Sequence, residues 1–351
     1  MDTILLPKEA ETVDFTIQSL FSNEAFPSFT EVAAGLVSGE LPLFDCEEYF
    51  SQAIVSYFFS GINELKNLFF YSLILAFFFL ISGTKKQTPA VETGFFLTYL
   101  LMVAELVKVY IRSAEVVQKA LEALLEFLNA FLPAYCTGLA VAAGGSCATA
   151  FYGVAFLAIT IAGTVFGRIV LPLTGMYFLL SVFNRFFCED LISRLAGVFC
   201  AAAKIAMKVC IAGVLGIGSL RGMLAPAVDG VRRSGLLRIA GAIPVVGDLF
   251  DGATQTVMAA GGLVKNAIGM AGAVFVFVIC FIPALKIGIA CALLRVGAAL
   301  LQPVSDKRIG DCLELASKTH KMLFRILMYT MLLFLLLILL FAAFTGTGGK
   351  I

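Results

Sequence analysis

Runs of about twenty apolar residues recur along this chain, and they constrain its fold more than any other feature. The last of them, Leu323–Phe344, carries a single charge, and residues 67–82 carry none. Such a run matches the roughly 20 residues that a helix needs to cross a hydrocarbon core of about 30 Å. Of all 351 residues 60% are apolar and 14% charged, whereas soluble domains are typically about 25% charged. The sequence therefore predicts an all-α, polytopic integral membrane protein.

The apolar runs predict seven or eight membrane segments within residues 65–344. Ala148–Gly167 and Val170–Phe187 are treated as two segments because Pro172 disfavours a continuous helix. Ile268–Leu301 fits two packed segments better than one, since it is long and Pro283 interrupts it. The other candidate runs are Leu65–Gly83, Thr93–Ile111, Phe131–Ala143, Val198–Leu220 and Leu323–Phe344.

Residues 1–64 form an acidic N-terminal segment with eleven acidic side chains and one basic side chain, Lys8. Apolar residues recur at helical spacing in Phe44–Phe59, which predicts an amphipathic helix at the membrane interface. Lys85 and Lys86 follow the first apolar run. The positive-inside rule places that loop in the cytoplasm and the acidic segment outside. Met1–Ala10 lacks the cationic and apolar regions of a signal peptide, so none is expected.

Residues 221–267 interrupt the apolar pattern with charged residues, many glycines and two prolines. Irregular backbone at membrane depth requires protein or a wet cavity around its amides. We therefore predict a re-entrant or interfacial element, with an ordinary surface loop as the alternative. Its bend would be set by Gly230, Pro244 and Gly247. Its candidate polar residues are Asp229, Asp248 and Asp251, and for the last two a solvated turn is the competing interpretation.

Residues 302–325 are polar and amphipathic, and they predict a cytoplasmic connector before the last apolar run. His320, the only histidine, stands beside Lys318 and Lys321, so we expect it on a solvated basic face. Residues 345–351 form a short tail. The candidate contact with a partner protein in the connector is Asp306, Lys307 and Arg308.

Charged residues inside apolar runs are the informative polar residues, because a charge at the bilayer centre costs about 2.5–3.5 kcal/mol on insertion scales. Glu105 and Lys108 are three residues apart, so they share one helix face. The helical pattern continues through 112–132, which predicts one long helix leaving the membrane at a slant. Lys286, beside Pro283, is a candidate of the same kind. Either these residues serve a polar pathway or helix pairing, or they lie near helix ends and extend to the headgroups.

Small residues at short spacing predict close approach of helices in lipid. Such spacing relates Gly163 to Gly167, and it recurs in the series Gly269, Gly272 and Gly288. In a chain with 32 glycines, this spacing supports close packing without identifying a partner.

Several kinds of chemistry are excluded by residue type. One histidine rules out an HExxH motif and a multi-histidine metal site, and none of the nine cysteines forms a CxxC pair. Gly346–Lys350 is similar to the end of a P-loop, but Ile351 stands where Ser or Thr is required. We expect no enzymatic activity, no cofactor or metal, and no nucleic-acid partner.

Four strings carry a resemblance to a known family. They are SLRGMLAPAVDG at 219–230, AIPVVG at 242–247, LVKNAIG at 263–269 and LLQPVSDKRIGDC at 300–312. Together they resemble the stage III sporulation protein AE family, and RIVLP at 168–172 and SRLAG at 193–197 fit the same pattern. The resemblance is close over residues 165–315, and before them only the hydropathy profile agrees.

The resemblance implies a multi-spanning protein of the mother-cell membrane around the forespore. It would belong to a transenvelope channel or secretion-like complex that endospore development needs. The implied partners are a secretion-type ATPase, ring-forming proteins and a forespore-side protein, besides the lipid bilayer and further copies of the chain. The family has no established catalytic residues to carry over. Two alternatives stay open: a stand-alone secondary transporter that uses intramembrane charges and broken helices, and a purely structural membrane anchor.

Overall fold

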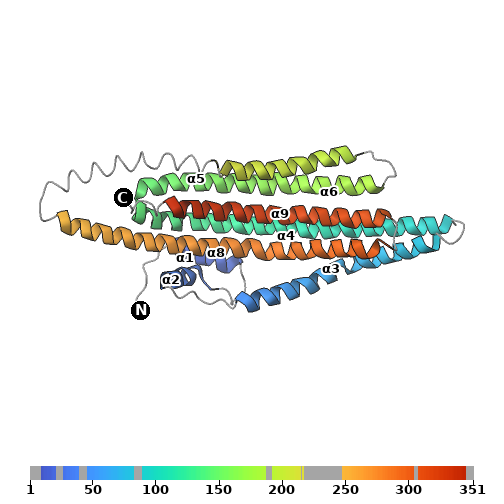
Figure 1. Ribbon diagram of the computed structural model, residues 1–351, viewed down its shortest axis with the longest axis horizontal. Helices are drawn as coiled ribbons and strands as arrows, with labels where there is room; N and C mark the ends of the chain where they lie inside the picture. Colours follow the sequence, from blue (N-terminus) through green and yellow to red (C-terminus); the bar gives the residue numbers. More distant parts are fainter. Residues whose placement is uncertain are drawn as a thin grey trace.

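The computed structural model describes residues 9–20, 27–38, 46–82, 89–186, 192–214, 216, 247–303 and 307–344. Within these ranges the regular elements are all helices. The longest helices run side by side and form an elongated bundle (Figure 1). The predicted all-α class is therefore confirmed.

Two helices set the length of the bundle. Both α4 (Pro89–Ala143) and α8 (Gly247–Leu301) have 55 residues. At a rise of 1.5 Å per residue each is about 80 Å long, well beyond a hydrocarbon core of about 30 Å. The remaining helices are α1 (Glu9–Leu20), α2 (Phe29–Ser38), α3 (Cys46–Ser82), α5 (Gly145–Gly163), the π-helix η1 (Thr164–Val170), α6 (Leu171–Phe186), the helix Ser193–Val214, and α9 (Lys307–Phe344).

Five helical stretches of the described chain are long and apolar enough to cross a membrane, and they agree with a multi-pass protein. They are Thr93–Ala142, Ala148–Arg185, Ser193–Val214, Gly261–Leu301 and Lys307–Leu339. This is fewer than the seven or eight segments predicted, because several predicted divisions fall inside continuous helices. The long helix expected through residue 132 is present and continues to Ala143.

The predicted break before Pro172 is absent, and α5 continues through η1 into α6. Proline has no backbone N–H and clashes with the preceding turn of an α-helix. Here the backbone N–H of Leu171 bonds to the carbonyl oxygen of Phe166, five residues earlier. Such a π-turn is a known way to accommodate an interruption of the regular bonding ladder. The two predicted segments thus form one rod.

The predicted division at Pro283 is also absent, because α8 passes through this residue as a single helix. Pro133 lies in the same way inside α4. A proline inside a helix costs about 3 kcal/mol, so surrounding packing has to offset it. Cys280, Ala284 and Ile287 of α8 are each almost completely buried, which supplies that packing around the proline.

Helix α2 packs on the two long helices through aromatic rings. Phe29 of α2 is fully buried, and its ring centroid lies 6.1 Å from that of Phe131 on α4 and 5.9 Å from that of Phe275 on α8. Phe127 is 5.7 Å from Phe131 and 5.9 Å from Phe275. Part of the acidic N-terminal segment is therefore packed on the bundle. The predicted amphipathic helix 44–59 is found from Cys46 onward as the first part of α3, which continues directly into the first apolar run.

Glycines on α8 let this helix approach three neighbours. A Cβ atom at Gly269 would lie 3.1 Å from Tyr135, and one at Gly272 would clash with Phe131, both on α4. A Cβ atom at Gly288 would lie 3.5 Å from the ring of Phe324 on α9, and one at Gly297 would clash with the ring of Phe69 on α3. The close packing predicted for the series Gly269, Gly272 and Gly288 is thus found. Of the other pair, Gly163 meets Leu125 of α4, whereas Gly167 faces open space.

Two predicted polar regions belong to regular helices where they are described. Residues 247–267 form the beginning of α8, so the irregular backbone expected there is not found, while residues 221–246 lie outside the described residues. Residues 307–325 form the first half of α9. They are amphipathic as predicted. They do not form a separate connector, because their apolar face is buried in the bundle as part of α9.

Candidate functional site: the polar contacts of helix α9

The buried face of α9 repeats at alternating intervals of four and three residues. Its members are fully or almost fully buried: Ile309, Leu313, Ala316, His320, Leu323 and Leu327. His320 is 0% exposed, so the expectation of a solvated basic face is wrong for this residue. Lys318 and Lys321, on either side, are exposed. The spacing from Ala316 to His320 and Leu323 is the sequence signal that identifies the histidine as inward-facing.

His320 joins α9 to α4 by a buried hydrogen bond. Its Nδ1 lies 2.8 Å from the carbonyl oxygen of Ala316, and its Nε2 lies 2.9 Å from Oγ of Ser113. A carbonyl oxygen only accepts, so Nδ1 carries the proton in the neutral ring, and Ser113 donates to Nε2. Ser113 is 6% exposed. Both ring nitrogens are therefore engaged in structural bonds.

Three further contacts tie the first half of α9 to other helices. Tyr99 Oη of α4 lies 3.3 Å from Cys312 Sγ. Ser317 Oγ donates to the carbonyl oxygen of Cys291 on α8 at 3.1 Å, and Cys291 Sγ lies 3.3 Å from the carbonyl oxygen of Ser317. We call these residues the α9 polar contacts: Tyr99, Ser113, Cys291, Cys312, Ser317 and His320.

An ion pair at the rim adds α6 to this arrangement. Arg185 Nη1 lies 3.1 Å from Asp311 Oδ2, and both side chains are partly exposed. The first half of α9 therefore bonds to α4, α6 and α8 through side chains. Because an unpaired buried polar group costs about 1–3 kcal/mol, these contacts fix how α9 is rotated and how far it is shifted along its neighbours.

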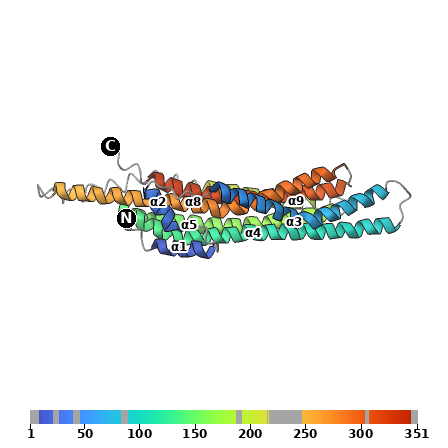
Figure 2. The ribbon, with the colours of Figure 1, turned by 90° about the horizontal axis from the view of Figure 1, so that it is seen from below.

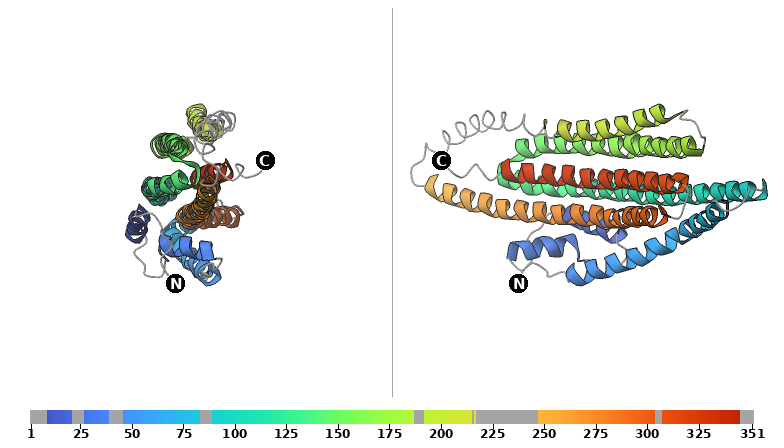
Figure 3. Two further views of the ribbon diagram at one scale, coloured as in Figure 1. Left: turned by 90° about the vertical axis from the view of Figure 1, so that its left-hand side faces the viewer. Right: turned by 45° about the vertical axis from the view of Figure 1, so that its right-hand side comes forward.

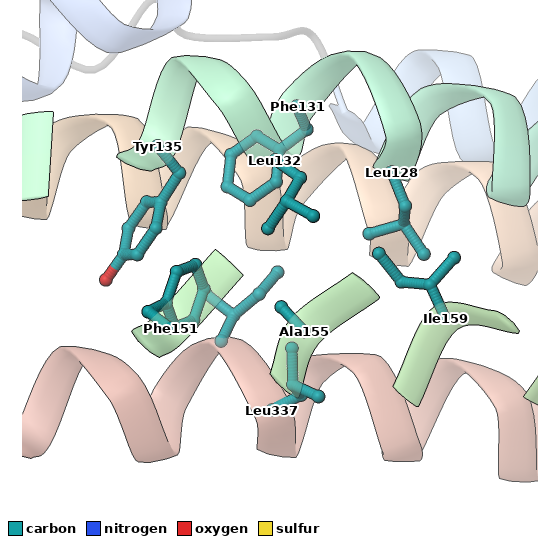
Figure 4. A pocket seen from close by; sticks show the side chains of 9 residues that line it. Leu128, Phe131, Leu132, Tyr135, Phe151, Ala155, Ile159 and Leu337 are labelled. Atoms are coloured by element: carbon teal, nitrogen blue, oxygen red, sulfur yellow. The ribbon is translucent and has the colours of Figure 1, made fainter. Parts of the chain in front are cut away.

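The second half of α9 packs through carbon instead. Leu337 and Ile338 face α4 and α5 across a small hollow (Figure 4). Its other lining residues are Leu128, Phe131, Leu132, Tyr135, Phe151, Ala155 and Ile159. Only the Tyr135 hydroxyl among these side chains is polar, so the hollow suits apolar packing and offers no set of groups for catalysis.

The structure brings one predicted pair together. Lys108 Nζ lies 3.1 Å from Glu105 Oε2 on α4, with the carboxylate side chain 8% exposed and the ammonium side chain 62% exposed. Glu105 thus faces inward and Lys108 reaches outward to neutralise it. Lys286 is half-buried on α8. It lies on a different helix from the pair.

The remaining predicted residues are spread over the molecule. Gly247, Asp248 and Asp251 form the first turns of α8. Lys307 and Arg308 begin α9, and both are exposed. Asp229, Pro244 and Asp306 lie outside the described residues.

Lys265 on α8 is a buried polar residue that was not singled out from the sequence. It is 2% exposed, and a Cβ atom at Gly138 of α4 would lie 3.5 Å from its Cα. The small residue allows the two helices to close over the lysine. Gly138 and Lys265 are far apart in the sequence and meet only through the packing of α4 on α8. No local sequence pattern therefore identified Lys265 as a buried residue.

Among the described residues no group of three or more His, Cys, Asp or Glu side chains could hold a metal ion. The α9 polar contacts are bonds between helices, and they hold α9 in position against α4 and α8.

Comparisons with known proteins identify the family of the chain. The family model for stage III sporulation protein AE matches residues 28–345. The stage III sporulation protein AE of Bacillus subtilis (strain 168) is 25% identical over 290 residues, which cover 81% of this chain and 73% of that protein. No solved structure matches the chain. The matched range extends well beyond the close resemblance at 165–315, and we conclude that the chain belongs to the stage III sporulation protein AE family.

Proposed function

We propose that this sporulation-related membrane protein is a non-enzymatic subunit of the transenvelope complex between mother cell and forespore. Its family membership over residues 28–345 is the observation that carries the proposal. In this role the chain lies in the mother-cell membrane around the forespore. Its partners are a secretion-type ATPase on the cytoplasmic side and ring-forming proteins on the other side.

The shape of the bundle supports a role as a platform. With its long axis across the membrane, α4 and α8 extend beyond the hydrocarbon core and offer protein surface on one or both sides. In this orientation each of the five long apolar stretches crosses the bilayer once, because a continuous helix passes through the hydrocarbon core only once. The remaining length of Thr93–Ala142, which has 50 residues, and of Gly261–Leu301, which has 41, extends beyond the core.

Charge at one end of the bundle supports the orientation. α3 ends and α4 begins at the end where α9 also begins (Figure 1). The sequence between α3 and α4 contains Lys85 and Lys86, and α9 begins with Lys307 and Arg308. Basic residues are enriched on the cytoplasmic side. We therefore place this end in the cytoplasm, with Asp306, Lys307 and Arg308 as the candidate ATPase contact and the N-terminal segment outside.

The state of the only histidine supports a non-enzymatic role. His320 uses Nδ1 on the Ala316 carbonyl oxygen and Nε2 on Ser113, inside a fully buried setting. A general acid or base has to reach a reacting group directly or through one water. Both ring nitrogens of His320 are occupied by bonds within the bundle, which supports a structural role for this side chain.

Deletion and complementation test the proposal. The gene is deleted in the host that encodes it and returned either unchanged or as Lys307→Glu with Arg308→Glu. We expect heat-resistant spores to be lost on deletion and restored by the unchanged gene. We expect the double variant to reach the membrane at normal level, to restore few spores, and to lose co-purification of the ATPase.

Two results would overturn parts of this account. Normal spore numbers after deletion contradict a role in the complex. If the double variant restores spore formation fully, Lys307 and Arg308 are not the contact with the ATPase.

Two further results would favour or exclude the alternatives. Solute flux by the purified chain alone in liposomes favours the stand-alone transporter. A variant that leaves the complex assembled but blocks transport through it excludes a purely structural anchor.

A further inference from the structure

Four parts of the bundle are stretches of helix whose sequence contains no charged residue. They are residues 127–143 of α4, 145–167 of α5 and η1, 266–285 of α8 and 326–344 of α9. At 1.5 Å per residue each is about 25–35 Å long, which matches a hydrocarbon core of about 30 Å. We call these stretches the apolar layer. Toward the end of the bundle where α9 begins, each is bounded by a charged residue: Glu126, Arg168, Lys286 or Arg325.

The structure brings the four stretches to one height along the bundle. Phe131 of α4 lines a single small hollow together with Phe151 of α5 and Leu337 of α9. A Cβ atom at Gly272 of α8 would clash with the ring of the same Phe131. Each stretch therefore has a residue at the height of Phe131, and the bilayer surrounds the bundle at this height.

The outer surface of α5 and α9 within the apolar layer is itself apolar. Phe156, Leu157 and Ile161 of α5 are large side chains in exposed positions. Leu336 and Leu339 of α9 are exposed in the same way. Apolar side chains that point outward at membrane depth suit acyl chains.

Helices α1 and α2 lie at the same height on another side of the bundle. The ring centroid of Phe29 on α2 is 6.1 Å from that of Phe131. The next residue, Thr30, donates from its hydroxyl to Oδ2 of Asp14 on α1 at 2.6 Å and from its backbone N–H to Oδ1 at 3.2 Å. Figure 2 shows both helices at the part of the bundle away from the beginning of α4. Figures 1 and 3 show α1 and α5 on different sides of α4.

The two short helices are apolar toward the bundle and polar toward the outside. Their buried side chains are mainly apolar: Ala10, Val13, Ile17, Phe29, Val32 and Ala33. Their exposed side chains are mainly acidic or polar: Glu9, Glu11, Thr12, Gln18, Ser19 and Glu31. Phe15, which is exposed on α1, is the exception. This division is typical of helices whose outer face meets water.

The beginning of α2 is held by a capping box. The backbone N–H of Ser28 donates to Oε2 of Glu31 at 2.9 Å, and the backbone N–H of Glu31 donates to Oγ of Ser28 at 3.2 Å. The pair is exposed, so the carboxylate of Glu31 stays on the surface of the molecule. The acidic surface at this height is therefore part of the folded α1–α2 pair.

We propose that the side of the bundle formed by α1 and α2 borders a water-filled recess within the membrane, open to the extracytoplasmic side, whereas the α5 side faces acyl chains. Carboxylates at membrane depth are costly in lipid and occur where they meet water or protein. Water is the neighbour that this surface fits, because the core of a protein interface is rich in large apolar and aromatic side chains. Among the exposed side chains of α1, Phe15 alone is of that kind.

The opening follows from the place of α1 and α2 within the apolar layer. Counted along α9, Leu337 is about 18 Å from Arg325 at one border and about 10 Å from Phe344 at the other. The shorter path to bulk water therefore leads away from the end that carries Lys307 and Arg308. That this path leads to the extracytoplasmic side rests on the orientation in the proposed function.

Cysteine labelling tests the recess in membranes of the sporulating host that encodes the chain. Gln18 is one turn from Asp14, and Phe156 follows Ala155 of the hollow, so both positions lie near the height of Phe131. Gln18→Cys and Phe156→Cys are exposed to a membrane-impermeant maleimide in right-side-out and in inverted vesicles, with the unaltered chain as background. We expect Gln18→Cys to react in right-side-out vesicles at least several-fold faster than Phe156→Cys. After denaturation in SDS both should react equally, which shows that each thiol is intact.

Two results overturn the proposal. Equally slow labelling of the two variants means that lipid or a partner protein covers α1. Equally fast labelling of both means that the α5 side does not face acyl chains.

A third result separates the recess from the proposed function. Labelling of Gln18→Cys in inverted vesicles alone contradicts the stated opening, and it contradicts the proposed orientation with it. The sporulation role is tested by spore counts after deletion, which do not depend on how fast either thiol reacts.

Lysine substitution at the same two positions gives an independent measurement. We expect Gln18→Lys to reach the membrane at nearly the normal level, because its charge meets water and the carboxylates nearby. Phe156→Lys should lower the amount in the membrane fraction at least several-fold, since its charge would lie among acyl chains. Equal amounts of the two variants contradict the difference between the two sides.

Discussion

Oγ of Ser113 on α4 lies 2.9 Å from Nε2 of His320 on α9, in a part of the bundle where both side chains are buried. The histidine is oriented by its second bond, from Nδ1 to the carbonyl oxygen of Ala316. Two helices distant in sequence are thereby held in one register.

Ser113→Ala leaves Nε2 of His320 buried without its donor. An unsatisfied buried acceptor costs about 1–3 kcal/mol, so we expect a lower thermal unfolding midpoint in detergent. Thr160→Ala is the matched control, because the Thr160 hydroxyl is exposed and bonds only within its own helix. Equal midpoints for the two variants would show that the buried bond does not stabilise the bundle.

Lys108→Met removes the charge that neutralises the inward-facing carboxylate of Glu105. The lysine is well exposed, so the expected loss of stability is about 1 kcal/mol or less. Adding Glu105→Gln should recover most of that loss, since the buried charge is then gone. Lys119→Met, on the same face without this partner, serves as control, and thermal unfolding checks all four chains. A double variant that assembles normally with its partners marks the pair as structural only.

Gly272→Ala places a methyl group against the ring of Phe131. Overpacking of this kind typically costs about 1–3 kcal/mol, and it would push α8 away from α4. Gly153→Ala is the control, because nothing lies within 4 Å of its Cβ position. We expect the first variant to unfold at a markedly lower temperature and the second to match the unaltered chain. The opposite order would contradict the observed contact.

Gly144→Ala tests the turn between α4 and α5. Gly144 has φ 88° and ψ 155°, a region that side-chain-bearing residues rarely adopt. The substitution should cost about 1–3 kcal/mol. Gly145→Ala, one residue later at the start of α5 with open space around its Cβ, should be neutral or slightly stabilising. Proteolysis in detergent micelles measures both, and similar rates for the two variants would contradict the assigned turn.

The part of the fold that the sequence predicted correctly follows from its apolar runs. They identified the apolar helices and the long helix through residue 132. The prediction divided the chain wrongly at Pro172 and Pro283, because whether a proline ends a helix depends on the packing around it. That packing comes from helices distant in sequence, which cover side chains of α8 such as Ala284 and Ile287.

The polar contacts were harder to predict than the helices. Glu105 and Lys108 pair as their spacing indicated, because both lie on one helix. His320 was assigned by its lysine neighbours, although its interval from Ala316 indicates the buried face. Its partner Ser113 is 207 residues away, and no local pattern relates the two.

The central claim is that the long axis of the bundle crosses the membrane, and labelling at the two ends of α8 tests it most directly. Asn266→Cys and Ala299→Cys occupy exposed positions 33 residues apart, about 50 Å along the helix. A membrane-impermeant maleimide is applied to right-side-out and to inverted vesicles, with the unaltered chain as background. We expect position 299 to be labelled only in inverted vesicles and position 266 only in right-side-out vesicles. Labelling of both positions from the same side would contradict the account, because the bundle would then lie along the membrane surface.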